Sequence, residues 1–189
     1  MLLSLAALYL VLYLFFDGPA NRHTANDNTS GVVTLLELAA ALPQEQRSKV
    51  CFVFFDNEEK GLFGSSAFAK KHKDAKKNAL VLNFDCVGDG DSLQFYPSKQ
   101  LKGDEGFVSA LAAAFPAEGE KSSEVVTGFG FYPSDQKQFA RGVGVCALKK
   151  SRVFGYYMDR IHTRRDTVLE EENVRFLRDG TLRFLGAMQ

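Results

Sequence analysis

The sequence lacks an excess of charge of either sign, because its 189 residues include 23 basic and 23 acidic side chains. Proteins that bind nucleic acid usually present a basic face or stripe, so this balance argues against nucleic acid as a partner. Five lysines do gather within residues 70–77. Their helical spacing is typical of a solvated helix end rather than of a binding patch.

Cysteine is also scarce, and its number is odd. Cys51, Cys86 and Cys146 each lie in an apolar, strand-like run. Buried thiols behave as small hydrophobic groups, and this spacing predicts neither a disulfide framework nor a zinc knuckle. Cysteine usage therefore favours a reducing compartment. The sequence shows no internal repeat, and its 46% of hydrophobic residues can form the core of one domain.

Residues 1–16 are apolar apart from Ser4. A helix of this length spans roughly 24 Å, which is short of the ~20 residues usually needed to cross a bilayer. A signal peptide and a buried core element are the alternatives, although no Lys or Arg precedes the run and residues 17–20 form a poor cleavage site. We favour the end of a transmembrane helix for residues 1–20, whose beginning lies outside this chain. A membrane-associated protein is then expected, with an α/β domain over residues 21–189.

Helix and strand patterns alternate after a turn cluster at residues 18–21. Apolar spacing predicts helices at about 30–42, 63–71, 106–115, 136–140 and 171–185. Strands are predicted at 50–56, 79–85, 93–96, 125–128 and 143–148. This alternation predicts an α/β fold with a largely parallel central sheet and helices on both faces, preceded by an apolar N-terminal helix.

Two adjacent carboxylates, Glu58 and Glu59, follow the predicted strand 50–56. Ligands of open α/β sheets bind at the carboxyl ends of the strands, where this pair is expected to lie. Neighbouring carboxylates resist full ionisation unless a cation lies beside them or one holds a proton. The pair therefore indicates metal chemistry, with a solvated turn as the alternative.

Three further residues could join this pair. Asp85 ends the predicted strand 79–85, Asp27 precedes a helix that it or Asn28 could simply cap, and His162 is one of three histidines. With Glu59 they give three carboxylates and an imidazole at one edge of a sheet, a ligand set that zinc accepts. Glu58 would then be surplus to coordination, and a carboxylate beside a metal-bound water is the general base that a hydrolase needs.

Five segments, in order and at similar spacing, make the sequence resemble the co-catalytic zinc aminopeptidases of metallopeptidase family 28. They are ANDNTSG (25–31), FFDNEEKGLFGS (54–65), NFDCVG (83–88), SDQKQF (134–139) and IHTRRDT (161–167). The resemblance covers nearly everything from residue 25 onward. It implies a globular α/β domain of the phosphorylase/hydrolase-like type, which binds two zinc ions that share one aspartate and removes the N-terminal residue from peptide substrates.

The same resemblance assigns a role to each candidate residue. Asp27 becomes the bridging ligand, Glu59 and His162 the ligands of one metal, Asp85 a ligand of the other, and Glu58 the general base. The segment 134–139 matches one that lies beside the substrate pocket of relatives. It adds candidate substrate contacts (Ser134, Asp135 and Phe139).

One family segment is missing. The resemblance implies a His-x-Asp segment upstream of Asp27, where this chain has its apolar start, and some bacterial relatives place membrane-spanning segments at that point. We therefore expect the C-terminal part of a longer protein, with one zinc site incomplete, a fragment of low activity and a cytoplasmic catalytic domain. His23 is a weak substitute ligand, and His72 is expected at the surface. A non-catalytic, receptor-like domain and a glutaminyl cyclase remain the alternative functions.

Overall fold

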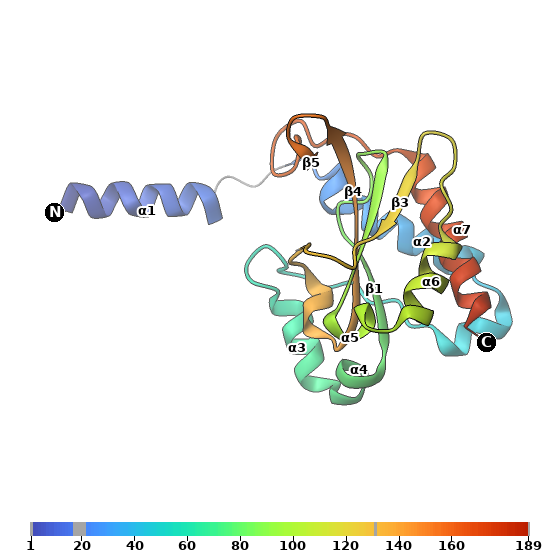
Figure 1. Cartoon of the computed structure of the whole chain (residues 1–189). Coiled ribbons are helices and arrows are strands. Elements are labelled where there is room, and N and C mark those ends of the chain that lie inside the picture. Colours follow the sequence, from blue (N-terminus) through green and yellow to red (C-terminus); the bar gives the residue numbers. More distant parts are fainter. Residues whose placement is uncertain (1, 17–21, 131, 189) are drawn as a thin grey trace.

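A computed structural model describes residues 2–16, 22–130 and 132–188 of the chain (Figure 1). Its centre is a mixed sheet with the strand order β1-β4-β2-β3. The strands are β1 (Leu80–Phe84), β2 (Ser92–Pro97), β3 (Ser122–Val125), β4 (Arg141–Ser151) and β5 (Gly155–Tyr157), which forms a hairpin with β4.

The sheet is less parallel than the sequence predicts. β4 pairs parallel with β1 but antiparallel with β2 and β5, and β2 pairs parallel with β3. Only residues 85–91 connect β1 to β2, whereas a crossover between parallel strands needs a dozen residues or more. The prediction of a largely parallel sheet was therefore wrong, because hydrophobic runs identify strands without fixing their directions.

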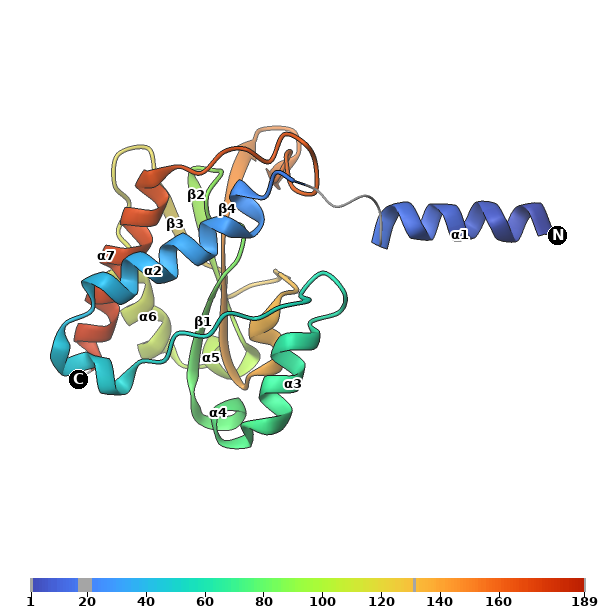
Figure 2. The same cartoon turned by 180° about the vertical axis from the view of Figure 1, so that it is seen from behind.

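Helices cover both faces of the sheet, as predicted (Figures 1 and 2). α2 and α7 pack on each other, α2 also contacts β1, and α6 contacts β3, whereas η3 contacts β1 and β4 and is itself covered by α3. The bounds are α2 (Gly31–Ala41), α3 (Phe63–Lys71), α4 (Lys73–Asn78), α5 (Lys99–Lys102), α6 (Glu105–Ala114) and α7 (Glu171–Ala187). Three short turns complete them: η1 (Ala25–Ser30), η2 (Gln44–Lys49) and η3 (Asp135–Gln138).

The C-terminal helix α7 shows how one face of the sheet is covered. Val174, Leu177 and Phe184 recur at helical spacing and are buried. Gly180 lies on the same face, where a Cβ atom would stand 2.2 Å from the ring of Phe115. The glycine that weakens the helix pattern in the sequence is thus the residue that lets α7 approach the aromatic core.

The predicted strand 50–56 is not a strand in the structure. Figure 2 shows this segment as a trace without a strand arrow that crosses in front of β1. Its apolar side chains are only partly covered, and Phe54 is 54% exposed. Apolar and β-branched residues favour an extended chain, but a strand also needs a paired neighbour. Among the described residues, no strand is hydrogen-bonded to this segment. The strand predicted at 125–128 is also displaced, to β3.

The apolar start forms the helix α1 (Leu2–Phe16), which lies apart from the α/β body in both views (Figures 1 and 2). Within the described parts of the chain, no helix reaches the length and apolarity needed to cross a membrane. The turn cluster and the boundary that we predicted at residue 20 fall outside the described residues. Membrane association and the cytoplasmic location remain predictions.

Candidate metal centre

Three of the predicted ligands meet at one point. His162 Nε2 lies 2.8 Å from Glu59 Oε1 and 3.0 Å from Asp27 Oδ2. One donor atom from each of the three residues lies within 4.8 Å of the other two. Asp27 is the most buried of the three, with a side chain 16% exposed, whereas those of His162 and Glu59 are 60% and 58% exposed. The cluster is therefore open to solvent on one side.

Asp27 also belongs to a second, deeper cluster. Its carboxylate lies within 4.8 Å of donor atoms of Asp85 and Cys86. The Cys86 thiol is buried among carboxylates, and burial raises its pKa far above the usual range. A thiol that resists ionisation is a poor ligand. The candidate metal ligands of this cluster are thus the two aspartates. Asp27 is common to both clusters.

Asn28 joins the start of α2 to the end of β1. Its Oδ1 accepts hydrogen bonds from the backbone N–H groups of Gly31 (3.0 Å) and Cys86 (3.3 Å), and its Nδ2 donates to the carbonyl oxygen of Phe84 (3.1 Å). The helix-capping alternative therefore applies to Asn28. Asp27 makes no such contact, and its carboxylate faces His162 instead.

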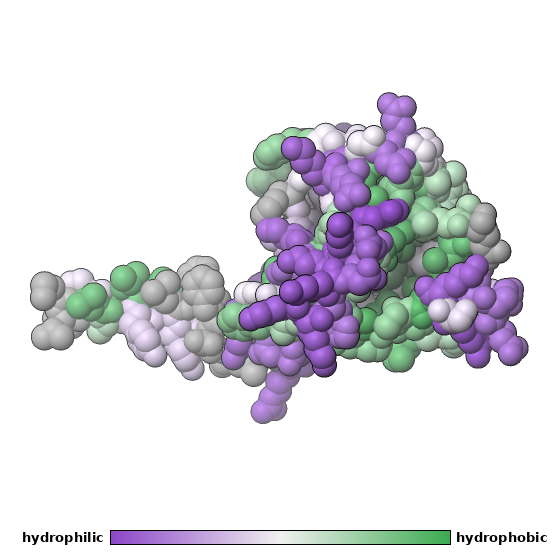
Figure 3. All heavy atoms as spheres, turned by 90° about the horizontal axis from the view of Figure 1, so that it is seen from below, coloured by the Kyte–Doolittle hydropathy of each residue, from purple (hydrophilic) through white to green (hydrophobic). Residues whose placement is uncertain are grey.

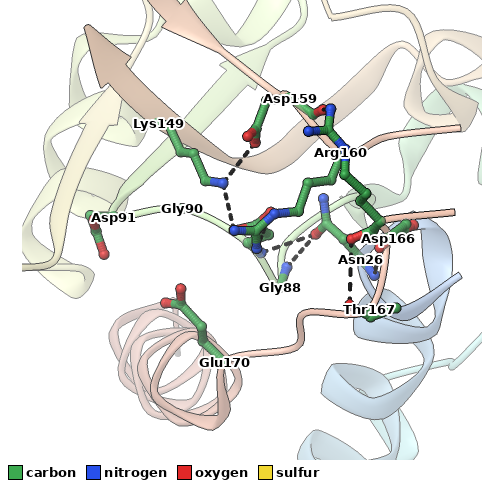
Figure 4. Close-up of polar contacts among 12 residues, drawn as sticks. Asn26, Gly88, Gly90, Asp91, Lys149, Asp159, Arg160, Asp166, Thr167 and Glu170 are labelled. Atoms are coloured by element: carbon green, nitrogen blue, oxygen red, sulfur yellow. Dashed lines mark hydrogen bonds and ion pairs between the residues drawn. The ribbon is translucent and has the colours of Figure 1, made fainter. Parts of the chain in front are cut away.

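Asp166 fixes the backbone on which Asp27 stands. The buried carboxylate accepts hydrogen bonds from the N–H groups of Asn26 (2.6 Å) and Asp27 (3.0 Å), while the Asn26 side chain accepts from Gly88 (2.7 Å) and Asp89 (3.1 Å). Figure 4 shows Asn26 between Asp166 and the loop at Gly88. We missed Asn26 and Asp166 as functional residues, although both lie within the quoted segments ANDNTSG and IHTRRDT.

Ion pairs around buried Asp89 hold the turn that carries His162. Asp89 contacts Lys149 Nζ (3.2 Å) and the Arg160 guanidinium (3.3 Å), and Lys149 also pairs with Asp159 (2.7 Å). Figure 4 shows Lys149, Asp159 and Arg160 side by side. His162 itself has a φ of 58°. A side chain in this left-handed region is strained, and such strain concentrates at functional sites.

The loop after residue 56 turns back tightly and places Glu58 beside Glu59. The carbonyl oxygen of Glu58 accepts hydrogen bonds from the N–H groups of Gly61 (3.0 Å) and Leu62 (2.8 Å). Gly61 has a φ of 109°, which side chains rarely adopt. Backbone hydrogen bonds and a glycine thus set the direction in which both carboxylates leave the chain.

The gathered carboxylates disfavour one another's ionised forms. Burial, and then the charges of Glu59 and Asp85, raise the pKa of Asp27 to about 7. Burial, and then Asp85, Glu59, Asp135 and Asp27, raise the pKa of Glu58 to about 7. Burial also raises the pKa of Asp85. A cation among these groups would relieve this repulsion, so the donor set fits a metal ion.

The candidate substrate contacts lie mostly beneath the surface. Ser134 is buried and accepts a hydrogen bond from Asn83 Nδ2 (2.9 Å). Phe139 is buried and stacks with Phe55 at 6.2 Å between ring centroids. Asp135 is 7% exposed, and its charge acts on Glu58. Of the three, Asp135 is the one that the structure links to Glu58, and substrate contact remains a prediction for all of them.

The remaining histidines lie outside both clusters. His72 is exposed and its ring lies 4.3 Å from that of Phe68, which agrees with the predicted surface position. His23 is exposed and belongs to neither group of converging donors. The structure therefore lends no support to His23 as a substitute ligand.

This mixed α/β fold, with carboxylates and a histidine converging at one edge of its sheet, is typical of metallohydrolases. More narrowly, the model of peptidase family M28 matches residues 7–178. The chain belongs to this family.

Individual relatives are more distant. A protein of Arthroderma otae, named "Probable leucine aminopeptidase", is 26% identical over 152 residues, which are 76% of this chain and 42% of that protein. BSAP, a zinc aminopeptidase from Bacillus subtilis, has a similar structure with a TM-score of 0.63 and 23% identity, covering 87% of this chain and 42% of that one. The LapA aminopeptidase of Legionella pneumophila gives a TM-score of 0.57 at 18% identity, covering 86% and 46%. The chain thus spans less than half the length of these relatives.

Proposed function

We propose that the protein is a zinc-dependent peptidase of the aminopeptidase type, with Glu58 as its general base. The observation that carries the proposal is the convergence of Asp27, Glu59 and His162 on one point, next to a carboxyl group that is surplus to the cluster. Membership of a peptidase family and the resemblance to zinc aminopeptidases support the same reaction class.

Two carboxylates and an imidazole could hold a zinc ion and leave a position for the reacting groups. When bound, zinc supplies a Lewis acid that polarises a carbonyl group and lowers the pKa of water. Asp27, positioned by Asp166, is available to both clusters, whereas Asp85 reaches only the deeper one. The deeper cluster offers two carboxylate ligands, so we infer one tight zinc site in this chain and one weak site.

Glu58 is suited to move the proton in this reaction. Its half-buried carboxyl group has a pKa raised to about 7, mainly by burial and by Asp85. A base of this pKa can take a proton from water near neutral pH and return it to the leaving amine. Glu58 stands one residue from Glu59, so the loop 57–62 fixes the base relative to the proposed metal site.

The test is Glu58→Gln in the 189-residue chain loaded with zinc. We expect the wild type to release amino acid from an N-terminal leucine substrate slowly and only with metal. The variant should lose this activity by about 10²- to 10⁴-fold and keep its zinc affinity, measured by calorimetry. Equal activity of the variant would remove Glu58 from the mechanism. A wild type that shows no zinc-dependent release, or that instead cyclises N-terminal glutamine, would contradict the proposed reaction.

A further inference from the structure

The hairpin formed by β4 and β5 ends in an exposed apolar tip. Val153 and Phe154 are 82% and 81% exposed, which places them among the most exposed large hydrophobic residues of the described chain. The turn itself is well defined. Ser151 Oγ accepts hydrogen bonds from the N–H groups of Val153 (3.1 Å) and Phe154 (3.2 Å), and Gly155 has a φ of 72°. Local hydrogen bonds therefore fix a turn that presents two apolar side chains to solvent.

Aromatic and basic side chains stand behind this tip. Tyr156 and Tyr157 of β5 are exposed. Lys150 Nζ lies 5.4 Å from the centre of the Tyr156 ring, and the Tyr156 hydroxyl donates to Glu124 on β3 (3.3 Å). Arg152 lies within the turn and is exposed. An apolar tip followed by tyrosines and cations is typical of a segment that enters the interface of a lipid bilayer.

The charge of the hairpin region is opposite to that of an anionic membrane. Residues 149–165 include six basic side chains and one acidic side chain, which leaves 17 basic and 22 acidic side chains for the rest of the chain. The single acid, Asp159, pairs with Lys149 (2.7 Å), and Asp89 pairs with Lys149 and Arg160. The other four basic side chains are all exposed (Lys150, Arg152, Arg164 and Arg165).

The apolar helix α1 leaves the body at the same edge. The N–H group of Ala25 donates to the carbonyl oxygen of Asp166 (3.2 Å), which follows β5 in the chain. Figures 1 and 2 both place α1 and the hairpin at one end of the molecule. In Figure 3, the coloured part of α1 shows none of the strongly hydrophilic residues that cover much of the body. Residues 17–21 connect α1 to residue 22 and span at most about 22 Å, so a lipid surface that takes up α1 lies close to this edge.

We propose that the β4–β5 hairpin docks on an anionic lipid surface, with Val153 and Phe154 inserted among the lipid chains and Lys150 and Arg152 at the headgroups. A stable protein partner would need about 20 to 30 residues on each side, more than this tip offers. A bilayer supplies a continuous apolar phase, in which an apolar helix such as α1 is also at home. The proposal concerns where the chain is held and does not depend on the peptidase function.

Tryptophan fluorescence of the whole chain tests the docking, because the sequence has no tryptophan. Phe154→Trp places a reporter at the tip. Met188→Trp is the matched control, an exposed position at the C-terminal end of α7, which lies far from β5 and α1 in Figure 1. The probes are vesicles of phosphatidylglycerol and phosphatidylcholine, with and without bromine on their acyl chains. Emission of Phe154→Trp should shift to shorter wavelength and be quenched by the brominated lipid, and emission of Met188→Trp should do neither.

Co-sedimentation with the same vesicles separates the apolar from the electrostatic contribution. Val153→Ser combined with Phe154→Ser should lower the partition coefficient by about tenfold or more. Lys150→Gln combined with Arg152→Gln should lower it by about fivefold for each charge removed, and less at high salt. Lys73→Gln combined with Lys77→Gln is the matched control, because it removes two exposed charges from α4 and should leave the partition coefficient unchanged.

Three results would overturn the proposal. The first is a vesicle-bound chain in which the emission of Phe154→Trp stays unchanged, because α1 alone would then attach the protein. The second is a shift of Phe154→Trp to shorter wavelength before any lipid is added, because α1 or a second copy would then cover the tip. The third is an equal loss of partitioning in the hairpin and α4 charge variants, because binding would then depend on overall charge.

Discussion

Asp166→Asn should both loosen the fold and weaken zinc binding, because Asp166 is the acceptor for two backbone N–H groups beside the proposed site. Its side chain is 1% exposed, and its two oxygens lie 2.6 Å from the nitrogen of Asn26 and 3.0 Å from that of Asp27. Asparagine keeps the shape but has one acceptor and one donor. One N–H group would then face the new NH₂ group.

The expected cost follows from these contacts. Each hydrogen bond to a buried charged group contributes about 1.5 to 3 kcal/mol, and the variant loses one bond and weakens the other. We expect the free energy of unfolding to fall by about 3 kcal/mol in urea titration. Loss of a group that orients a metal ligand usually lowers metal affinity by about 10- to 100-fold, which calorimetry with zinc would measure on the folded fraction.

Asp74→Asn is the matched control. Asp74 is exposed on α4, away from both clusters, and accepts a hydrogen bond from Asn78 Nδ2 (2.7 Å), so the same change there should cost at most about 1.5 kcal/mol and leave zinc affinity unchanged. If Asp166→Asn binds zinc as tightly as the wild type, the backbone held by Asp166 does not set the position of Asp27, and this reasoning is refuted.

Three further predictions concern separate parts of the molecule. His162→Ala should lower zinc affinity by at least about tenfold in calorimetry. His72→Ala, which changes an exposed histidine close to the ring of Phe68, should leave zinc affinity unchanged. Equal effects of the two substitutions would exclude His162 as a ligand. Gly180→Ala should lower the free energy of unfolding by about 1 to 3 kcal/mol in urea titration, because its Cβ would meet Phe115. Gly186→Ala is the control, since nothing lies within 4 Å of the added Cβ, and it should not destabilise the protein. An unchanged free energy of unfolding in Gly180→Ala would show that Phe115 can move. Zinc titration of the whole chain should show one tight site, and two equally tight sites would contradict the weakness of the deeper cluster.

Local sequence patterns were sufficient for most of the elements but not for their pairing. The helix α7 was predicted in spite of Gly180, and β1, β2 and β4 lie within a few residues of the predicted strands. Residues 50–56 have the composition of a buried strand, yet they remain unpaired. Composition shows that a segment favours an extended conformation. Strand formation also requires a paired neighbour, which is often distant in sequence. The antiparallel direction of β2 was unpredictable for the same reason.

The candidate site was predictable in its charged residues and not in its supporting ones. Asp27, Glu59 and His162 stand out in the sequence because carboxylates and histidine are typical metal ligands, and the structure brings them together. Asn26 and Asp166 act through hydrogen bonds to backbone groups. Their places in the segments ANDNTSG and IHTRRDT mark both residues, but the contacts themselves depend on how residue 26 and residue 166 meet in the folded chain.

A crystal structure of the chain with zinc, located by its anomalous scattering, would test the central claim most directly. The account predicts a zinc peak within about 2.0 to 2.2 Å of Asp27 Oδ, Glu59 Oε and His162 Nε2, with the Glu58 carboxyl group near the open side. A zinc ion bound elsewhere, with His162 turned away from Asp27 and Glu59, would contradict the proposed metal centre.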